Sequence, residues 1–128
     1  GQVQLMFADA TSALPFIKSG KVIPLGVGNP QRSDLAPDVP AIADEGLPGY
    51  EAYSWSGLFA PAGTPADIVK QVNENLNAQL NDKSVIEKMH GSGSEAMPMT
   101  PEEFGKFLSD EIAKWHKTIA EANITIQG

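Results

Sequence analysis

The sequence predicts an α/β protein. Short extended patterns fill the first part of the chain, longer helical stripes fill the second part, and the composition changes near Pro61. Strand patterns that precede helical patterns, with no internal repeat, favour a layered fold that contains both elements. The chain has 128 residues, which is enough for one compact domain with its own core.

An alternation of apolar and polar residues opens the chain and predicts a half-buried strand over residues 1–7. A short helix is predicted over residues 12–19, with Pro15 close enough to its first turn to be tolerated. Because the strand pattern starts at once, without a signal peptide before it, we expect the chain to be a fragment of a longer protein. The apolar members of the alternation are Val3, Leu5 and Phe7.

The middle of the chain combines two further extended segments with irregular structure. Residues 21–27 predict a second strand, in which Pro24 indicates an edge position or a bulge. Residues 29–50 are rich in Pro, Gly and Asp and predict irregular structure with one helical turn over residues 41–45. Residues 52–60 predict a third extended segment, closed by a proline.

Two similar start signals predict the long helices of the second half. Thr64 and Thr100 each precede a proline and have an acidic residue three positions later, a pattern typical of a helix N-cap. A shorter helix is predicted over residues 84–90, and a short strand over residues 95–99. Helical spacing predicts one buried face on the first long helix, formed by Ile68, Val69, Val72, Leu76 and Leu80. The last helix carries its apolar residues on one side: Phe104, Leu108, Ile112, Trp115 and Ile119.

The composition excludes several classes of function. The net charge is −7 and the nine Lys and Arg residues are scattered singly, so we predict no nucleic acid partner. The absence of cysteine excludes disulfides and thiolate metal sites. His90 and His116 lack a second His or an acid at ligand spacing, and we interpret both as surface residues. We find no nucleophile–base pair, and therefore expect no enzyme, no catalytic residue, no metal and no cofactor.

One segment is a candidate binding site: Ala8, Asp9 and Ala10, where the first strand ends and the first helix begins. In open α/β sheets, ligands gather outside the carboxyl ends of strands, where helix N-termini present N–H groups. Asp9 therefore has two interpretations, as a helix N-cap or as a side chain directed into a ligand cleft. The residue type by itself favours the cap, because Asp is a preferred capping residue.

Three strings in this order resemble the C-terminal part of a known family: VQLMFADATSALPFIKSGKVIPLGV, RSDLAPDVPAIADEGLPGYEAYSWSGLFAPAGTPADIV and TPEEFGKFLSDEIAKWHKTIAEANI. The family is that of the Bug-type extracytoplasmic solute-binding receptors of tripartite tricarboxylate transporters. The resemblance runs essentially from end to end of the chain. Its most specific pieces are PDVP, LPGYE, APAGTP and TPEEF.

The resemblance implies a two-lobed periplasmic-binding-protein fold of the type II-like class, which closes on its ligand. It places residues 1–50 in the second ligand-binding lobe and residues 51–63 in a hinge crossover strand and linker. Residues 64–128 would form a C-terminal helical part that packs on the first lobe.

The resemblance also implies a function without catalysis. Family members capture small organic acids in the periplasm and deliver them to a membrane permease. The ligands are dicarboxylates, tricarboxylates, acidic amino acids or aromatic carboxylates. Ala8, Asp9 and Ala10 would line the cleft, although many relatives place Asp directly after the Phe, where this chain has Ala8.

A different function remains open for the chain by itself. The resemblance implies that the protein encoded by the gene is more than twice as long, and that this fragment binds no ligand alone. The alternative is a structural or oligomerisation role, because amphipathic helices separated from part of their lobe expose apolar faces, and such faces favour self-association.

Overall fold

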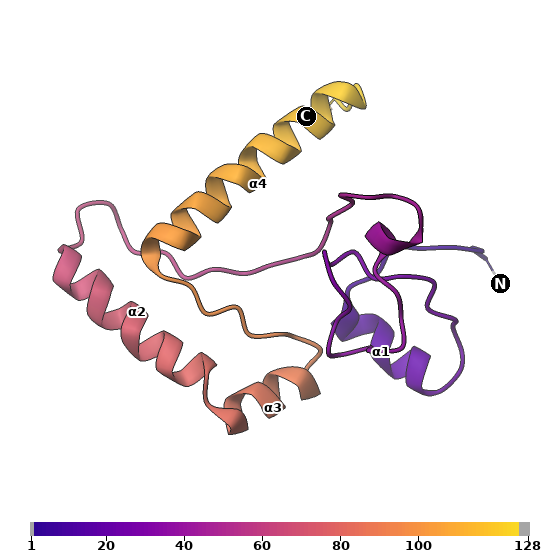
Figure 1. Cartoon of the computed structure of the whole chain (residues 1–128), viewed down its shortest axis with the longest axis horizontal. Helices are drawn as coiled ribbons and strands as arrows, with labels where there is room; N and C mark the ends of the chain where they lie inside the picture. Colours follow the sequence, from indigo (N-terminus) through magenta and orange to yellow (C-terminus); the bar gives the residue numbers. More distant parts are fainter. Residues whose placement is uncertain (1, 126–128) are drawn as a thin grey trace. The chain divides into compact units, whose positions relative to one another are not determined.

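The computed structural model describes residues 2–125 of the chain. Its contacts divide it into two compact units, one formed by Gly1–Phe59 with Asn81–Ala96 and the other by Ala60–Leu80 with Met97–Gly128. The helices, shown in Figure 1, are α1 (Ala10–Lys18), the 3-10 helix η1 (Ile42–Glu45), α2 (Ala66–Leu80), α3 (Lys83–Gly91) and α4 (Pro101–Glu121). The predicted helices are thus confirmed, each within a few residues of its expected position.

A short parallel pairing forms the centre of the first unit. The amide of Val27 donates to the carbonyl of Pro40 at 2.9 Å, and the amide of Ile42 donates to the carbonyl of Val27 at 3.0 Å. This places Val27 opposite Ala41, whose exposed fraction is 0%. Val39 is also buried, so the core of this unit is small and lies at the pairing.

A glycine permits two segments of the first unit to approach closely. The amide of Ala52 donates to the carbonyl of Gly28 at 2.9 Å. A β-carbon at Gly28 would lie 2.0 Å from the carbonyl oxygen of Ala52, a distance that no side chain tolerates. Only glycine therefore allows the start of the 52–60 segment to lie against residue 28.

The predicted strands are wrong as strands in this structure. Between residues 2 and 125 the strands predicted over 1–7 and 95–99 form no ladder, and the strand predicted over 21–27 pairs only at Val27. The 52–60 segment, predicted only as extended, also forms no ladder. Residue 1 of the first segment lies outside the described residues. A strand requires a neighbour that accepts and donates its backbone hydrogen bonds. The alternating pattern predicts an extended backbone, but it does not supply that neighbour.

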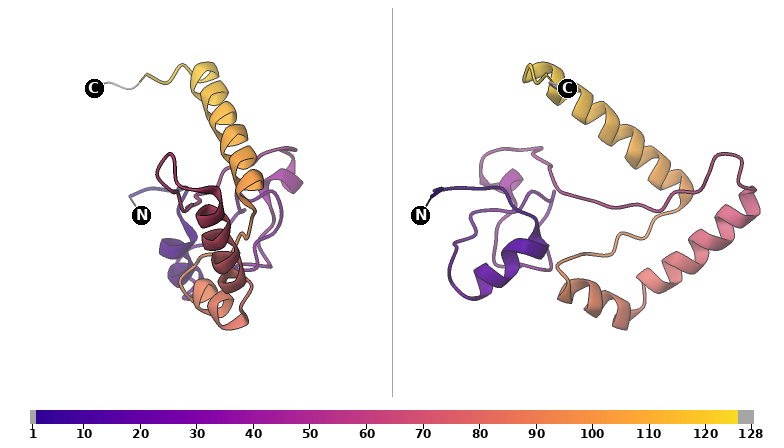
Figure 2. Two further views of the ribbon diagram at one scale, coloured as in Figure 1. Left: turned by 90° about the vertical axis from the view of Figure 1, so that its left-hand side faces the viewer. Right: turned by 180° about the vertical axis from the view of Figure 1, so that it is seen from behind.

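The second unit contains α2 and α4, which contact each other. Figure 2 shows α4 as one continuous helix. The carbonyl of Met99, just before α4, accepts hydrogen bonds from the side-chain amides of Asn73 at 2.8 Å and Asn77 at 2.9 Å. These two residues lie one turn apart on α2, so a polar contact attaches this helix to the segment that leads into α4.

The two predicted N-caps have different outcomes. Thr100 is confirmed: its hydroxyl accepts from the amide of Glu103 at 3.2 Å, and the Glu103 carboxylate accepts from the amide of Thr100 at 2.8 Å. The cap predicted at Thr64 is wrong, because its hydroxyl donates to the carbonyl of Pro61 at 2.8 Å and α2 begins only at Ala66. The Thr64 hydroxyl stabilises the turn before the helix instead.

The apolar stripes of α2 and α4 are largely exposed, which for α2 corrects the expectation of a buried face. On α2 the exposed members include Ile68, Val72 and Leu76. On α4 they are Ile112, Trp115 and Ile119. The helical spacing predicts an apolar face correctly, but within the described residues little covers that face.

Candidate functional site

The candidate site begins at Asp9, which holds the N-cap position of α1. Its backbone is extended, with φ −69° and ψ 145°, and its carbonyl accepts from the amides of Ser12 and Ala13, both at 3.0 Å. The Ser12 hydroxyl donates to the same carbonyl at 2.8 Å. The backbone of Asp9 therefore starts the helix as the sequence predicts, with Ala8 exposed before it and Ala10 half-buried after it.

The side chain of Asp9 does not cap the helix. No side-chain capping hydrogen bond is formed at this position. Instead the Asp9 Oδ1 atom accepts a hydrogen bond from the Ser54 hydroxyl at 2.6 Å. A short O–H···O⁻ bond to an ionised carboxylate is stronger than a neutral one, which explains why Ser54 competes well with the helix amides. The interpretation of the Asp9 side chain as a cap is wrong, and sequence reasoning missed Ser54.

The first turn of α1 consequently presents backbone donors that the Asp9 carboxylate does not satisfy. Ala10 and Thr11 are the first two helical residues, and amides at these positions have no acceptor inside the helix. Such amides, together with the helix dipole, favour an anion or an oxygen of a polar ligand. The local arrangement thus combines a fixed carboxylate with nearby N–H donors.

The end of α3 packs directly on this first turn. Gly93 follows α3 with a φ of 79°, and the amide of Ser94 donates to the carbonyl of Met89 at 2.9 Å, which is the Schellman pattern of a helix end. A β-carbon at Gly93 would lie 2.8 Å from the Cα atom of Thr11 and 2.9 Å from its nitrogen. Gly93 therefore fixes the position of the α1 start, a role that the sequence indicates only as a helix stop.

Glu95, two residues after Gly93, accepts hydrogen bonds from the loop that begins at residue 29. Its Oε1 atom accepts from the Ser33 hydroxyl at 2.9 Å and from the Asp34 amide at 2.8 Å. The side-chain amide of Asn29 donates to Oε2 over a longer 3.5 Å. Ser33 is only 7% exposed, so Glu95 satisfies a buried hydroxyl. The partners lie 61 or more positions apart, and no local pattern in the sequence indicates the contact.

Two acids with lowered pKa values act in helix starts and not in the candidate site. The Ser84 hydroxyl, followed by the amides of Val85 and Ser84, lowers the pKa of Asp82 at the start of α3. The backbone amide of Thr100, followed by its hydroxyl, lowers the pKa of Glu103 at the start of α4. In both cases hydrogen bonds to the ionised form are the cause, which is the normal consequence of capping.

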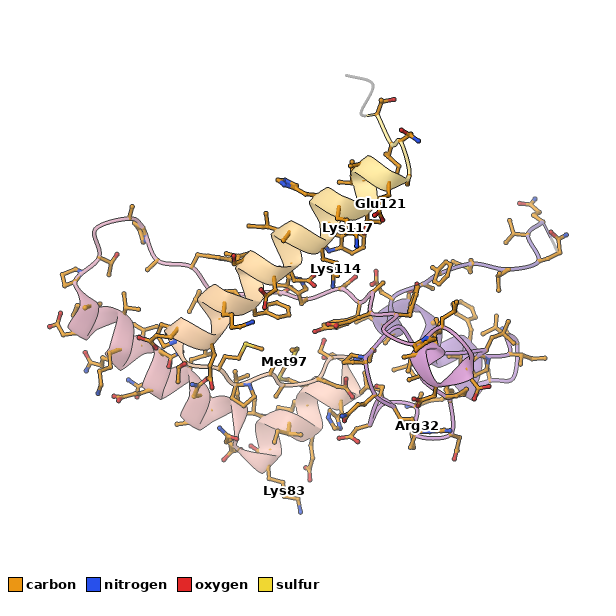
Figure 3. The ribbon with its side chains drawn as sticks, turned by 45° about the horizontal axis from the view of Figure 1, so that its top comes forward. Arg32, Lys83, Met97, Lys114, Lys117 and Glu121 are labelled. Carbon is orange, nitrogen blue, oxygen red and sulfur yellow. The ribbon has the colours of Figure 1, made fainter. Side chains whose placement is uncertain are left out.

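A polar cluster on α4 stabilises that helix. Glu111, 7% exposed, accepts from the Trp115 indole N–H at 3.1 Å and pairs with Lys114. The Lys114 ammonium also lies 5.6 Å from the centre of the Trp115 ring. Further along the helix Lys117 pairs with Glu121 at 3.9 Å, and these Lys and Glu side chains are labelled in Figure 3. All of these partners belong to one helix, so the cluster stabilises α4 locally.

The histidines do not join the candidate site: His90 lies half-buried in α3 and His116 lies exposed on α4. Among residues 2–125, no group of three or more His, Cys, Asp and Glu side chains is arranged to hold a metal ion. In the same part of the chain, no helix has both the length and the apolar character needed to cross a membrane.

Comparison with known proteins adds a family and solved structures. Residues 1–124 match the family described as tripartite tricarboxylate transporter family receptor. A relative from Pseudomonas sp. strain P51, described as the UPF0065 protein in the tcbD-tcbE intergenic region, is 34% identical over 122 residues. That match covers 94% of this chain and 36% of the relative.

Three solved structures have a similar backbone. R. palustris Rpa4515 with adipate has a TM-score of 0.75 at 33% identity, covering 91% of this chain and 39% of that one. Periplasmic binding protein BugD has a TM-score of 0.72 at 29% identity, with coverages of 90% and 39%. MatC from Rhodopseudomonas palustris with bound malate has a TM-score of 0.67 at 29% identity, with coverages of 86% and 38%. The chain thus spans between 36% and 39% of the length of these proteins.

Proposed function

This chain belongs to the tripartite tricarboxylate transporter receptor family, and we propose that it contributes to a periplasmic solute-binding protein that captures small organic carboxylates for a membrane permease. No step of this function breaks or forms a covalent bond. The chain would therefore act by recognition alone, without a catalytic residue or a cofactor.

The observation that supports this proposal most directly is the arrangement at the start of α1. The Asp9 carboxylate is held by the Ser54 hydroxyl at 2.6 Å and leaves the first-turn amides of Ala10 and Thr11 uncapped by its side chain. A ligand oxygen at the Ala10 amide would receive a hydrogen bond from a rigid helix start, whereas the Thr11 nitrogen is in close contact with Gly93. In this proposal Ala8, Asp9 and Ala10 line the ligand cleft.

The solved structures of similar proteins support the proposed ligand class. One of them contains adipate and another contains malate, both of which are dicarboxylates. We extend this class to the present chain as a small organic acid: a dicarboxylate, a tricarboxylate, an acidic amino acid or an aromatic carboxylate.

The proposal also assigns the parts of the chain to lobes. Residues 1–50 belong to the second ligand-binding lobe, residues 51–63 to the hinge crossover strand and linker, and residues 64–128 to a helical part on the first lobe. The exposure of large apolar side chains supports this assignment, because another part of the receptor would cover them: Phe7 is 80% and Ile23 is 83% exposed. Paired strands over the extended segments would give the α/β fold that the family resemblance implies.

The same exposed side chains favour the second candidate function, a structural or self-associating fragment without ligand binding. The two candidates differ in what covers the apolar faces: the remainder of a receptor, or another copy of the chain. Analytical ultracentrifugation of the 128-residue chain separates them. A concentration-dependent oligomer that binds no carboxylate in any context would favour the structural candidate.

The proposed function is tested on the full-length protein encoded by the gene. A thermal-shift screen covers the four ligand classes, and each hit is followed by calorimetric titration. A carboxylate that binds the folded state at a hundred times its Kd stabilises it by about 2.7 kcal/mol, a clear rise in the melting temperature. We expect at least one such ligand, and no measurable binding by the 128-residue chain alone. If none of the four classes raises the melting temperature, the proposal is wrong.

A further inference from the structure

The Asp9 carboxylate has unused acceptor capacity. Among the described residues, its hydrogen bond is the one that Oδ1 accepts from the Ser54 hydroxyl at 2.6 Å. An ionised carboxylate has about four lone-pair sites and donates nothing. The side chain is exposed, so the Oδ2 atom keeps its capacity to accept hydrogen bonds from outside the chain.

The group that holds this carboxylate comes from a separate segment. Ser54 lies 45 positions from Asp9, in the extended stretch that begins where the Ala52 amide donates to the Gly28 carbonyl at 2.9 Å. The helix start is also in close contact with Gly93. Asp9 is therefore held through both its backbone and its side chain before any ligand arrives, which reduces the entropy lost on binding.

A fixed negative charge at this position restricts the ligand. The Asp9 carboxylate repels a ligand carboxylate placed against it. A hydrogen-bond donor of the ligand is favourable at the same place. We infer that Asp9, positioned by Ser54, determines specificity by favouring carboxylates that also carry a hydroxyl or ammonium group over the same carboxylates without that group. This inference rests on the proposed function, because it concerns the same site.

The inference distinguishes two roles. Asp9 would contact the donor of the ligand directly, whereas Ser54 acts through Asp9 and is a positioning residue. Ser56 provides a matched control, because it is an exposed serine two positions after Ser54. Among the described residues, its side chain makes no hydrogen bond.

The test measures pairs of ligands that differ by one donor group, by calorimetric titration of the full-length protein. The pairs are malate with succinate, glutamate with glutarate, citrate with tricarballylate, and mandelate with phenylacetate, one for each ligand class. A charge-assisted hydrogen bond makes the donor-bearing member bind about ten- to a hundredfold more tightly in the pair that the protein accepts.

The variants then locate the source of that preference. Asp9→Ala and Ser54→Ala should each reduce the preference to less than about threefold. Ser54→Thr, which keeps the hydroxyl, should restore it, and Ser56→Ala should not change it. In the Asp9→Ala background, Ser54→Ala should have no further effect, because a positioning residue acts only through its partner. Melting temperatures of all variants exclude simple unfolding.

Each remaining outcome overturns a defined statement. Equal affinity for both members of the accepted pair overturns the specificity inference and leaves the proposed function intact. A preference that survives Ser54→Ala while Asp9→Ala removes it overturns the positioning role of Ser54. A wild-type protein that binds no member of any pair overturns the proposed function, and this inference with it.

Discussion

At the scale of single residues, Gly28 is the position where the backbone tolerates least change. The carbonyl of Ala52 occupies the space that a β-carbon would need, 2.0 Å away. Gly105 offers the opposite case: it lies within α4, and a β-carbon there would have no heavy atom within 4 Å outside the neighbouring helix backbone. Packing therefore requires glycine at residue 28, whereas at residue 105 glycine is only tolerated.

We predict that Gly28→Ala lowers the free energy of unfolding by about 3 kcal/mol, since the backbone at residue 52 must move. Gly105→Ala should raise it by about 0.5–1 kcal/mol, because alanine loses less conformational freedom in a helix than glycine. Urea unfolding followed by circular dichroism measures both changes. Equal effects of the two substitutions would contradict the packing argument.

The two threonines give a second prediction from single side chains. Thr100→Ala removes a capping box and should cost about 1 kcal/mol of stability. Thr64→Ala removes a hydroxyl that bonds only to the preceding turn, so we expect a change within about 0.5 kcal/mol. Thermal unfolding of both variants tests the difference. A larger loss at Thr64 than at Thr100 would show that the caps are assigned the wrong way round.

At the scale of elements, the starts of α3 and α4 make stability depend on acid pH. The pKa values of Asp82 and Glu103 are lower in the folded chain than in the unfolded chain, owing to their hydrogen bonds. Their contribution is therefore complete above the ordinary carboxyl values of about 4, and it is lost as the pH falls below them.

We predict that the free energy of unfolding of the wild type decreases between about pH 5 and pH 2, and decreases less steeply in the double variant Asp82→Asn, Glu103→Gln. Above about pH 6 the difference between the two proteins should be constant, because both carboxyls are then ionised in each state. Urea titrations at several pH values measure this. Parallel curves at low pH would contradict the capping assignment.

The elements also show which information the sequence contains. Helices are specified by signals that are close in the sequence. The apolar spacing of α2 lies within that helix, and the Asp82 cap and the Thr100 capping box lie at the first residues of α3 and α4. The predicted strands require a partner, and alternation at Val3, Leu5 and Phe7 does not identify one. The Asp9 site divides in the same way: the helix start is readable from the sequence, whereas Ser54, 45 positions away, is not. The ligand role of Asp9 stays a prediction.

At the scale of the whole molecule, the described residues bury few apolar side chains, with Val39 and Ala41 the buried hydrophobic ones. The apolar stripes of α2 and α4 nevertheless have the regular spacing of faces that are selected to be covered. Their exposure in this structure is consistent with a chain that spans 36% of its relative from Pseudomonas. In the proposed receptor, the apolar stripes of α2 and α4 would therefore be covered by surfaces outside the described residues.

The Glu95 contact has a consequence for the folding kinetics. Its carboxylate accepts a hydrogen bond from Ser33 across 62 positions, and closing so long a loop costs more chain entropy than forming a single helical turn. We therefore predict that this contact forms after the folding barrier, when the local helices are already present. Glu95→Gln should accordingly increase the unfolding rate and leave the refolding rate nearly unchanged, as stopped-flow chevron measurements would show. A slower refolding limb with unaltered unfolding would instead place Glu95 in the folding nucleus. If only the unfolding rate changes, the Glu95 contact determines how long the native state lasts, and not how quickly it is reached.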